Sequence, residues 1–420
     1  MRSLSEVTII VKRGGFPELA GTIYKNGCSL QSCRLLEEDQ GSETFVVEIA
    51  HSGREKFKRL LSFNSNRYRI VSVVDSREER ISGGLMRSYV RYPIENTGDF
   101  FTGVIDAAEL IQEKISEGAG RDFVGMTGNI GLISGIKGEG ILEPGRLYAL
   151  YAEAERDAVV INRFTNFNGV PVVIHFNHPE DLVQSLHRID VNFAAIRLVA
   201  LDDADLMLYS QICSELRVAV TSRMLDDIPV YLLALIMRMV KNFRLDREDT
   251  TVGFIGIDAG TQRLARLLLK TGFYRVLGSD QDEKLMLSFE REGGLATAQE
   301  NIFGNADIIV LMKNNYDREH HQYIRPGQYI ISMLKEFDVD REDMEARGIR
   351  QLVQCDETSL CSIYPGLVRG VLASGMESIH DEVLVMLAER IMQGMSRDFV
   401  LPDVFSDIHD TISNALEAME

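Results

Sequence analysis

The chain has few cysteines, and none of them forms a metal-binding pattern. They are odd in number and scattered, at Cys28, Cys33, Cys213, Cys355 and Cys361. A disulfide-stapled fold requires an even, closely spaced set, and a structural zinc site typically uses CxxC pairs, so the sequence favours neither class. We expect these cysteines to be reduced and to pack as small apolar side chains.

Long apolar runs and an excess of positive charge are also missing. The most apolar stretch, residues 228–237, is too short to span a bilayer, and residues 1–7 carry no apolar signal core. The formal net charge is −18 and the pI is near 5.0, whereas binding to nucleic acid or to an anionic membrane requires a basic face. We therefore expect a cytoplasmic protein whose partners are small molecules or other proteins.

The 420 residues, of which 45% are hydrophobic, are sufficient for two or three domains. In residues 1–76, hydrophobic periodicity predicts strands at 7–12, 29–37, 44–50 and 68–74 and helices at 18–26 and 54–61. This βαββαβ order, with a glycine and proline turn after the first strand, resembles the ACT domain, a ferredoxin-type module.

ACT domains bind amino acids or other small effectors at paired interfaces. The resemblance therefore implies a homodimer or higher homo-oligomer and an effector site at Arg13, Gly15, Phe16, Leu19 and Gly27. Because a fold does not carry its ligand with it, a module used only for dimerisation is an equally open alternative.

Residues 77–90 are charged and then glycine-rich, which predicts a linker. A second domain is expected over residues 91–226, with a glycine-rich loop at 128–140, helices at 103–117 and near 147–154, and strands at 158–161 and 170–174. Residues 227–395 start with a buried helix at 228–243 and continue with expected strands at 251–257, 274–279, 307–311, 328–333 and 351–354. Strands that alternate with helices predict an α/β fold with a doubly wound parallel sheet, and residues 396–420 form a C-terminal helical segment.

Four short segments carry a more specific resemblance. They are Gly-Asn-Ile-Gly at 128–131, Glu-Pro-Gly-Arg-Leu-Tyr-Ala-Leu at 143–150, Tyr-Pro-Gly-Leu-Val-Arg-Gly at 364–370 and Leu-Pro-Asp-Val-Phe at 401–405. In this order, residues 95–420 resemble the bacterial malic enzymes. That family oxidises malate with NAD or NADP and decarboxylates the product with a divalent metal, so the resemblance implies a malic-enzyme-like N-terminal domain followed by a Rossmann-type NAD(P)-binding domain.

The positions that match the family's catalytic residues are substituted. Phe101 stands at the tyrosine position, where a phenyl ring cannot deliver a proton. Arg146 stands at the lysine position, and arginine is a poor general base because it stays protonated near neutral pH. The substrate-binding asparagines are replaced by residues 335–336 (Lys-Glu) and 359–360 (Ser-Leu). Neither Phe101 nor Arg146 is expected to perform the family's proton transfers.

The metal positions are substituted as well. The family's Leu-Glu-Asp and His-Asp-Asp segments match Leu-Val-Ala at 198–200 and Ser-Arg-Met at 222–224, so no divalent metal is expected. Only a shifted alignment would restore ligands from the acidic residues nearby, namely Asp202, Asp203, Asp205, Asp226 and Asp227. We expect these carboxylates to face solvent, as acidic groups usually do.

The nucleotide-binding turn departs from its pattern too. A dinucleotide turn has the form GxGxxG, and this chain has Gly256, Asp258, Ala259, Gly260 and Thr261 there. Asp258 replaces the middle glycine, where its side chain would crowd and repel a pyrophosphate. Asp280 matches the acid that accepts a ribose hydroxyl and favours NAD, although a strand-end cap is the alternative. NAD is the cofactor that such a weakened site would take.

Three hypotheses follow for the function. The first, favoured because the substitutions converge on one cleft, is a non-catalytic or reassigned malic-enzyme homologue whose ACT-like module senses a small molecule. The second is an active NAD-dependent oxidoreductase for malate or a related hydroxy acid that uses displaced residues, with Arg146 orienting a carboxylate. The third is a structural subunit of an active relative.

Overall fold

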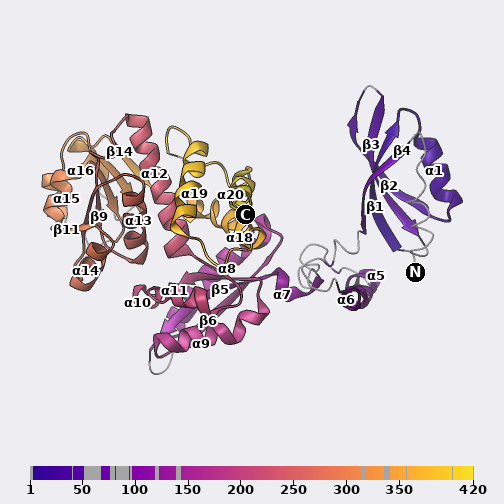
Figure 1. Ribbon diagram of the computed structural model, residues 1–420, viewed down its shortest axis with the longest axis horizontal. Coiled ribbons are helices and arrows are strands. Elements are labelled where there is room, and N and C mark those ends of the chain that lie inside the picture. The colour runs from indigo at the N-terminus through magenta and orange to yellow at the C-terminus, as the bar shows by residue number, and fades with distance from the viewer. Residues whose placement is uncertain are drawn as a thin grey trace. The chain divides into compact units, whose positions relative to one another are not determined.

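The chain divides into two units at residue 128. The computed structural model describes residues 3–39, 41–51, 68–75, 81, 94, 97–118, 123–138, 143–313, 318–334, 341–355, 357–399 and 401–419. The contacts of the chain separate Met1–Gly128 from Asn129–Glu420 (Figure 1).

The first unit contains a four-stranded antiparallel sheet. Its strands are β1 (Ser3–Lys12), β2 (Ser29–Glu38), β3 (Ser42–His51) and β4 (Tyr68–Asp75), in the order β2-β3-β1-β4, with α1 (Phe16–Lys25) between β1 and β2. Alternate residues of β1 are buried with α1, and the β-branched run at 7–12 that predicted the strand lies within it. The strand order is that of a ferredoxin-type sheet. The expected helix at 54–61 lies outside the described residues.

Short helices follow in the same unit. They are α5 (Thr97–Phe100), a π-helical turn η1 (Phe101–Ile105), α6 (Asp106–Ser116) and α7 (Gly125–Gly128). The helix expected at 103–117 is therefore present, with its first residues in a π turn. All of the expected linker at 77–90 except residue 81 lies outside the described residues.

The second unit begins with a four-stranded parallel sheet in the order β6-β5-β7-β8. Its elements are β5 (Asn129–Lys137), α8 (Pro144–Phe164), β6 (Asn168–Phe176), α9 (Pro179–Ile189), η3 (Asp190–Asn192), β7 (Ala195–Ala200), α10 (Asp203–Leu206), α11 (Tyr209–Glu215) and β8 (Ala219–Ser222). In this sheet β5 is an inner strand that lies between β6 and β7.

Two predictions for this region are wrong. The stretch expected as a glycine-rich loop at 128–140 is mainly the buried strand β5. Its glycines serve packing, because a Cβ at Gly135 would lie 2.5 Å from the Leu201 side chain. The strand expected at 158–161 is part of the 21-residue helix α8, whose buried face includes Ala158 and Ile161. A short apolar run does not distinguish a strand from one face of a helix.

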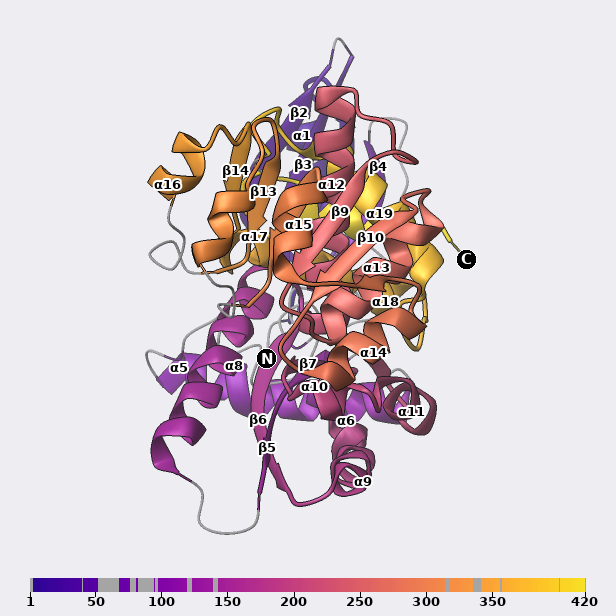
Figure 2. The same cartoon turned by 90° about the vertical axis from the view of Figure 1, so that its left-hand side faces the viewer.

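A six-stranded parallel sheet follows, in the order β11-β10-β9-β12-β13-β14 (Figure 2). Its strands are β9 (Thr251–Ile255), β10 (Arg275–Ser279), β11 (Leu295–Ala296), β12 (Ile308–Leu311), β13 (Tyr329–Ser332) and β14 (Gln351–Gln354). The intervening helices are α13 (Ala259–Lys270), α14 (Glu283–Arg291), α15 (Gln299–Asn305), η5 (Arg318–Tyr323) and α16 (Arg341–Ala346). This Rossmann-like arrangement confirms the doubly wound sheet that the alternating pattern predicts.

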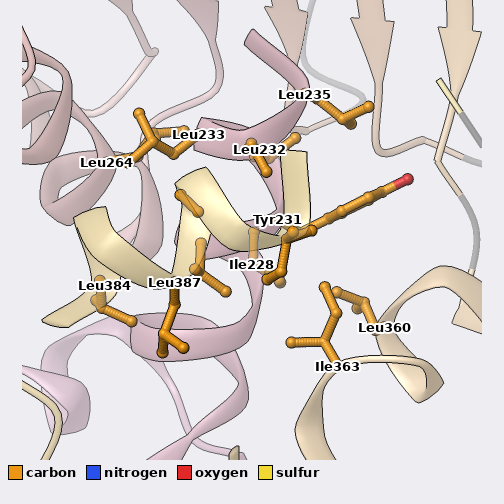
Figure 3. Packing of buried hydrophobic residues seen from close by; sticks show 14 of the residues in the cluster. Ile228, Tyr231, Leu232, Leu233, Leu235, Leu264, Leu360, Ile363, Leu384 and Leu387 are labelled. Atoms are coloured by element: carbon orange, nitrogen blue, oxygen red, sulfur yellow. The ribbon is translucent and has the colours of Figure 1, made fainter. Parts of the chain in front are cut away.

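Helices cover the two parallel sheets and contribute to the largest core of the unit. They are α12 (Ile228–Phe243), which follows the π turn η4 (Arg223–Asp227), together with α17 (Glu357–Cys361), α18 (Tyr364–Ala373), α19 (Asp381–Gly394) and α20 (Ile408–Glu417). Nearly every residue of α12 is buried, as expected, and Figure 3 shows its leucines meeting Leu384 and Leu387 of α19. Among the described helices, none combines the length and the apolarity that a bilayer crossing requires.

Candidate functional site

The turn between β9 and α13 lies where a doubly wound sheet binds its ligands. β10 and β12 flank β9 on opposite sides, so the strand order reverses at this point. Gly256 has a φ of +88°, and a Cβ there would lie 2.7 Å from the backbone nitrogen of Lys313. Only glycine fits this position, whether or not a ligand binds.

Asp258 caps α13 with its own side chain. One carboxylate oxygen accepts hydrogen bonds from the Thr261 backbone N–H at 2.7 Å and from the Thr261 hydroxyl at 2.8 Å. The residue is 5% exposed, and burial raises the pKa of its carboxyl. Its carboxylate thus occupies the helix N-terminus where a pyrophosphate would bind, and the expected crowding and repulsion of a pyrophosphate by Asp258 stay a prediction.

Two further carboxylates bind backbone N–H groups of the same turn. Asp280 accepts from the Ile257 N–H at 2.7 Å. Asp203, from the start of α10, accepts from the Ala259 N–H at 3.0 Å. Asp280 thus binds the backbone at the strand end, the alternative that the sequence left open, and three amides of the turn are bound by the chain's own acids.

Lys313 balances part of this charge. Its ammonium lies 3.5 Å from Asp203 and 3.8 Å from Asp280, and it donates to the Ile257 carbonyl at 2.5 Å. A pyrophosphate at this turn would have to displace Asp203 and would meet the buried Asp258 carboxylate. A pyrophosphate would therefore compete with the chain's own carboxylates for these amides.

Arg146 lies beside the same acidic segment. It is in the first turn of α8, where its guanidinium is 3.8 Å from Asp202, and both side chains are largely exposed. Lys137, at the end of β5, is 3.5 Å from the buried Asp205. The Asp202–Asp205 segment thus contacts the carboxyl end of the first parallel sheet on one side and the nucleotide-type turn on the other.

Phe101 belongs to the other unit. It lies in η1 with 52% of its surface exposed, and its ring is 6.0 Å from that of Phe100 in an edge-on arrangement. The residues at the family's tyrosine and lysine positions therefore come from different units of the chain.

The positions matched to metal ligands carry no carboxylates, and two acidic neighbours are engaged elsewhere. Asp226 accepts a hydrogen bond from Arg263 at 2.5 Å, and Asp227 accepts one from Arg197 at 2.5 Å. Both aspartates are fully buried, as is Asp205, so the expectation that they face solvent is wrong. Within the described residues, no group of three or more histidine, cysteine or acidic side chains is arranged to hold a metal ion.

Arg197 is the centre of a buried ion network that the sequence did not predict. Arg197, on β7, is 1% exposed and also donates to Asp157 of α8 at 3.3 Å, while its guanidinium lies 4.2 Å from the centroid of the Tyr364 ring. Burial raises the pKa of Asp227 to about 6, although Arg197 opposes that shift. The available signal was an arginine inside the otherwise apolar strand Ala195–Ala200.

The substrate-asparagine positions contribute no amide. Leu360 is buried in the core and Ser359 is partly buried, whereas residues 335–336 lie outside the described part of the chain. The matched segment at 364–370 forms α18, whose Gly366 would place a Cβ 2.8 Å from the His409 carbonyl of α20. This segment is therefore a packing motif between two helices.

The ACT-like residues cluster at the start of α1. Gly15 is the N-cap of α1, and Phe16 follows it with its ring 4.7 Å from that of Phe45. Arg13 is exposed and paired with Glu38 at 3.0 Å. Leu19 is buried in the core of this unit, so it is not available to touch an effector.

Gly27 follows α1 and has a φ of +73°, in the left-handed region that glycine adopts most easily. Its conformation accounts for a glycine at the end of the helix without any effector.

No family model matches the chain. It is 21% identical over 359 residues to NAD-dependent malic enzyme 1 of Bacillus subtilis. The matched region covers 83% of this chain and 81% of that protein. Its fold is similar to that of the malic enzyme from Pyrococcus horikoshii, with a TM-score of 0.60, 15% identity, and coverage of 87% of this chain and 90% of that one. The NAD-dependent malic enzyme from Thermotoga maritima also has a TM-score of 0.60, at 16% identity, with 77% of this chain and 94% of that one covered. The chain thus has the fold of the malic enzymes, and its sequence is similar to that of one of them.

Proposed function

We propose that this chain is a malic-enzyme-like protein that has lost malate turnover and acts as a ligand-responsive or regulatory protein. One observation carries the proposal. Asp203, Asp258 and Asp280 bind three backbone N–H groups at the turn where a dinucleotide would place its pyrophosphate. Because these carboxylates repel phosphate and already satisfy the amides, the turn is stable without a nucleotide.

The remaining positions support the same proposal. Oxidative decarboxylation of malate needs a proton acceptor, a proton donor and a metal to polarise the substrate. Arginine, which stands at position 146, is a poor proton acceptor, Phe101 has no ionisable group, and the positions matched to metal ligands carry no carboxylates. No single substitution excludes catalysis, but together they remove each function that the reaction requires.

NAD is the cofactor to test, because the Bacillus subtilis relative is named as NAD-dependent. The experiment is a calorimetric titration of the full chain with NADH and NADPH, together with the Asp203→Ala/Asp258→Gly variant. We expect no binding by the natural chain below millimolar concentration, and measurable NADH binding by the variant, in which the Ala259 and Thr261 amides are released. The Asp282→Gly variant is the matched control, because Asp282 caps α14 in the same way, at 2.8 Å from the Lys284 N–H.

Two results would overturn the proposal. One is micromolar NADH binding by the natural chain. The other is malate oxidation with Mn²⁺ and NAD at about 1 per second or faster, a rate typical of enzymes.

A further inference from the structure

A cavity lies at the opposite end of the six-stranded sheet from the nucleotide-type turn. It has a volume of about 800 Å³ and is formed by the C-terminal ends of α12 and α13, the segment that leads into β9, and Met392 of α19. Because β9 runs from Thr251 to Ile255, this segment lies at its amino end, whereas the turn at Gly256 lies at its carboxyl end. The volume is within the usual range for small-molecule sites.

Three cations line this cavity. They are Lys241, Arg244 and Arg247. In the described part of the chain, none of them has a carboxylate within ion-pair distance, and Arg247 donates only to the Thr271 carbonyl, at 3.4 Å. Two acids, Asp246 and Glu248, also line the cavity, and one oxygen of Asp246 accepts from the Glu248 N–H at 3.1 Å. The lining therefore carries three positive and two negative formal charges, which leaves it net positive in a chain whose net charge is −18.

The backbone at Arg244 adds a second observation. This residue ends α12 with a φ of +55°, in the left-handed region. Glycine adopts that conformation at a helix end without strain, so an arginine here carries a conformational cost. Cations near a helix C-terminus also interact favourably with the helix dipole. That effect accounts for Lys241 in the last turn of α12, but it does not require two further arginines beside it.

We infer that this cavity binds a small organic anion with two acidic groups, either carboxylates or phosphates. Arg244 and Arg247 bind its acidic groups through charge-assisted hydrogen bonds, and Lys241 adds a point charge. The apolar side chains of Met237, Val240, Leu245 and Met392 contact its hydrocarbon part. The site does not depend on the nucleotide-type turn, so a protein that no longer binds a dinucleotide still senses a metabolite here.

The test is a calorimetric titration of the full chain with succinate and, separately, with inorganic phosphate. We expect saturable binding of at least one of them in the millimolar range or tighter, which weakens as salt concentration rises. Succinate binding alone identifies a dicarboxylate site, and phosphate binding alone identifies a phosphate site. The bound anion also raises the melting temperature in proportion to its occupancy.

Single variants distinguish binding at this cavity from non-specific attraction of anions to surface cations. Arg244→Gln and Arg247→Gln should each weaken binding by about tenfold or more, the usual effect of losing a hydrogen bond to a charged group. Arg244→Lys should restore part of the affinity, because the charge returns without the planar fork. Arg390→Gln is the matched control, since Arg390 is an exposed arginine of α19 that does not line the cavity.

Three results would contradict the inference. They are no binding of either anion at about 10 mM, well above the millimolar range of weak sites, unchanged affinity in both arginine variants, or an equal loss in Arg390→Gln. Because Arg244 is exposed and Arg247 is only half-buried, the variants are expected to fold, and circular dichroism verifies this. Binding here should be unaffected in Asp203→Ala/Asp258→Gly, so this inference and the proposed function fail separately.

Discussion

Replacing Arg197 by methionine should strongly destabilise the second unit. Methionine keeps an unbranched apolar stem, but it removes the cation that faces Asp157 at 3.3 Å and Asp227 at 2.5 Å. Both aspartates are at most 1% exposed, so water cannot take over the role of the guanidinium. Breaking a buried ion pair by removing one partner typically costs about 3–5 kcal/mol of the free energy of unfolding.

This loss translates into a measurable fall in melting temperature. The second unit spans Asn129–Glu420. At roughly 2.1 cal/mol/K per residue, a unit of this length has an unfolding entropy of about 0.6 kcal/mol/K, so the melting temperature should fall by about 5–8 °C. Differential scanning calorimetry at pH 7 measures this change. The control is Arg275→Met, which removes an exposed ion pair with Asp249 and should cost less than about 1 kcal/mol.

A triple variant tests the electrostatic reason itself. Arg197→Met combined with Asp157→Leu and Asp227→Leu removes all three charges, and a buried network replaced by apolar groups often loses little stability. The triple variant should therefore recover much of the loss seen in the single variant. The reasoning is refuted if Arg197→Met alone melts within about 2 °C of the natural chain, or if the triple variant is less stable than the single one.

Three other predictions concern stability. Burial raises the pKa of Asp227 to about 6, above the usual unfolded value near 3.9. The contribution of this carboxyl to the free energy of unfolding is therefore present below pH 4 and is lost as pH rises through 6. In pH-dependent urea denaturation, the stability difference between the natural chain and Asp227→Asn should change by up to about 3 kcal/mol over this window. Burial opposes the ionisation of Asp381, but Arg266 and Arg263 stabilise its charge and lower its pKa to about 2. The contribution of this carboxylate to the free energy of unfolding is present above pH 4 and should vanish as pH falls through 2. A stability difference between the natural chain and Asp381→Asn that stays constant over this window would contradict the prediction. Gly169→Ala should destabilise by about 1–3 kcal/mol, because the new Cβ would lie 2.5 Å from Ala158 Cα, whereas the control Gly21→Ala, with open space around it in α1, should be neutral or stabilising in the same denaturation assay.

Much of the secondary structure follows from local patterns. The strands of the first unit were predicted from alternating β-branched residues, and the buried helix at 228–243 from its continuous apolar character. Predictions failed where one local pattern suits two structures. The glycines of β5 suggested a loop, but they allow close packing of neighbouring side chains, and the apolar run at 158–161 is one face of the long helix α8.

The candidate site was predicted less completely. The motif resemblance located the turn at Gly256 and the substituted positions Arg146 and Asp258. It did not reveal that Asp203 binds the Ala259 N–H, because 56 residues separate the two positions and no local pattern links them. It also assigned solvent exposure to Asp226 and Asp227, since composition rules describe isolated acids and not acids that face a buried arginine.

The sequence by itself therefore determined the classes of elements and the α/β organisation, because these depend on residue identity and short-range periodicity. Only the tertiary structure decided what the remaining charges do. Whether a carboxylate binds a metal, a nucleotide or the chain's own backbone depends on which distant segment lies within about 3 Å of it. At the β9–α13 turn that segment is the start of α10, which packing of the two parallel sheets places beside the amides.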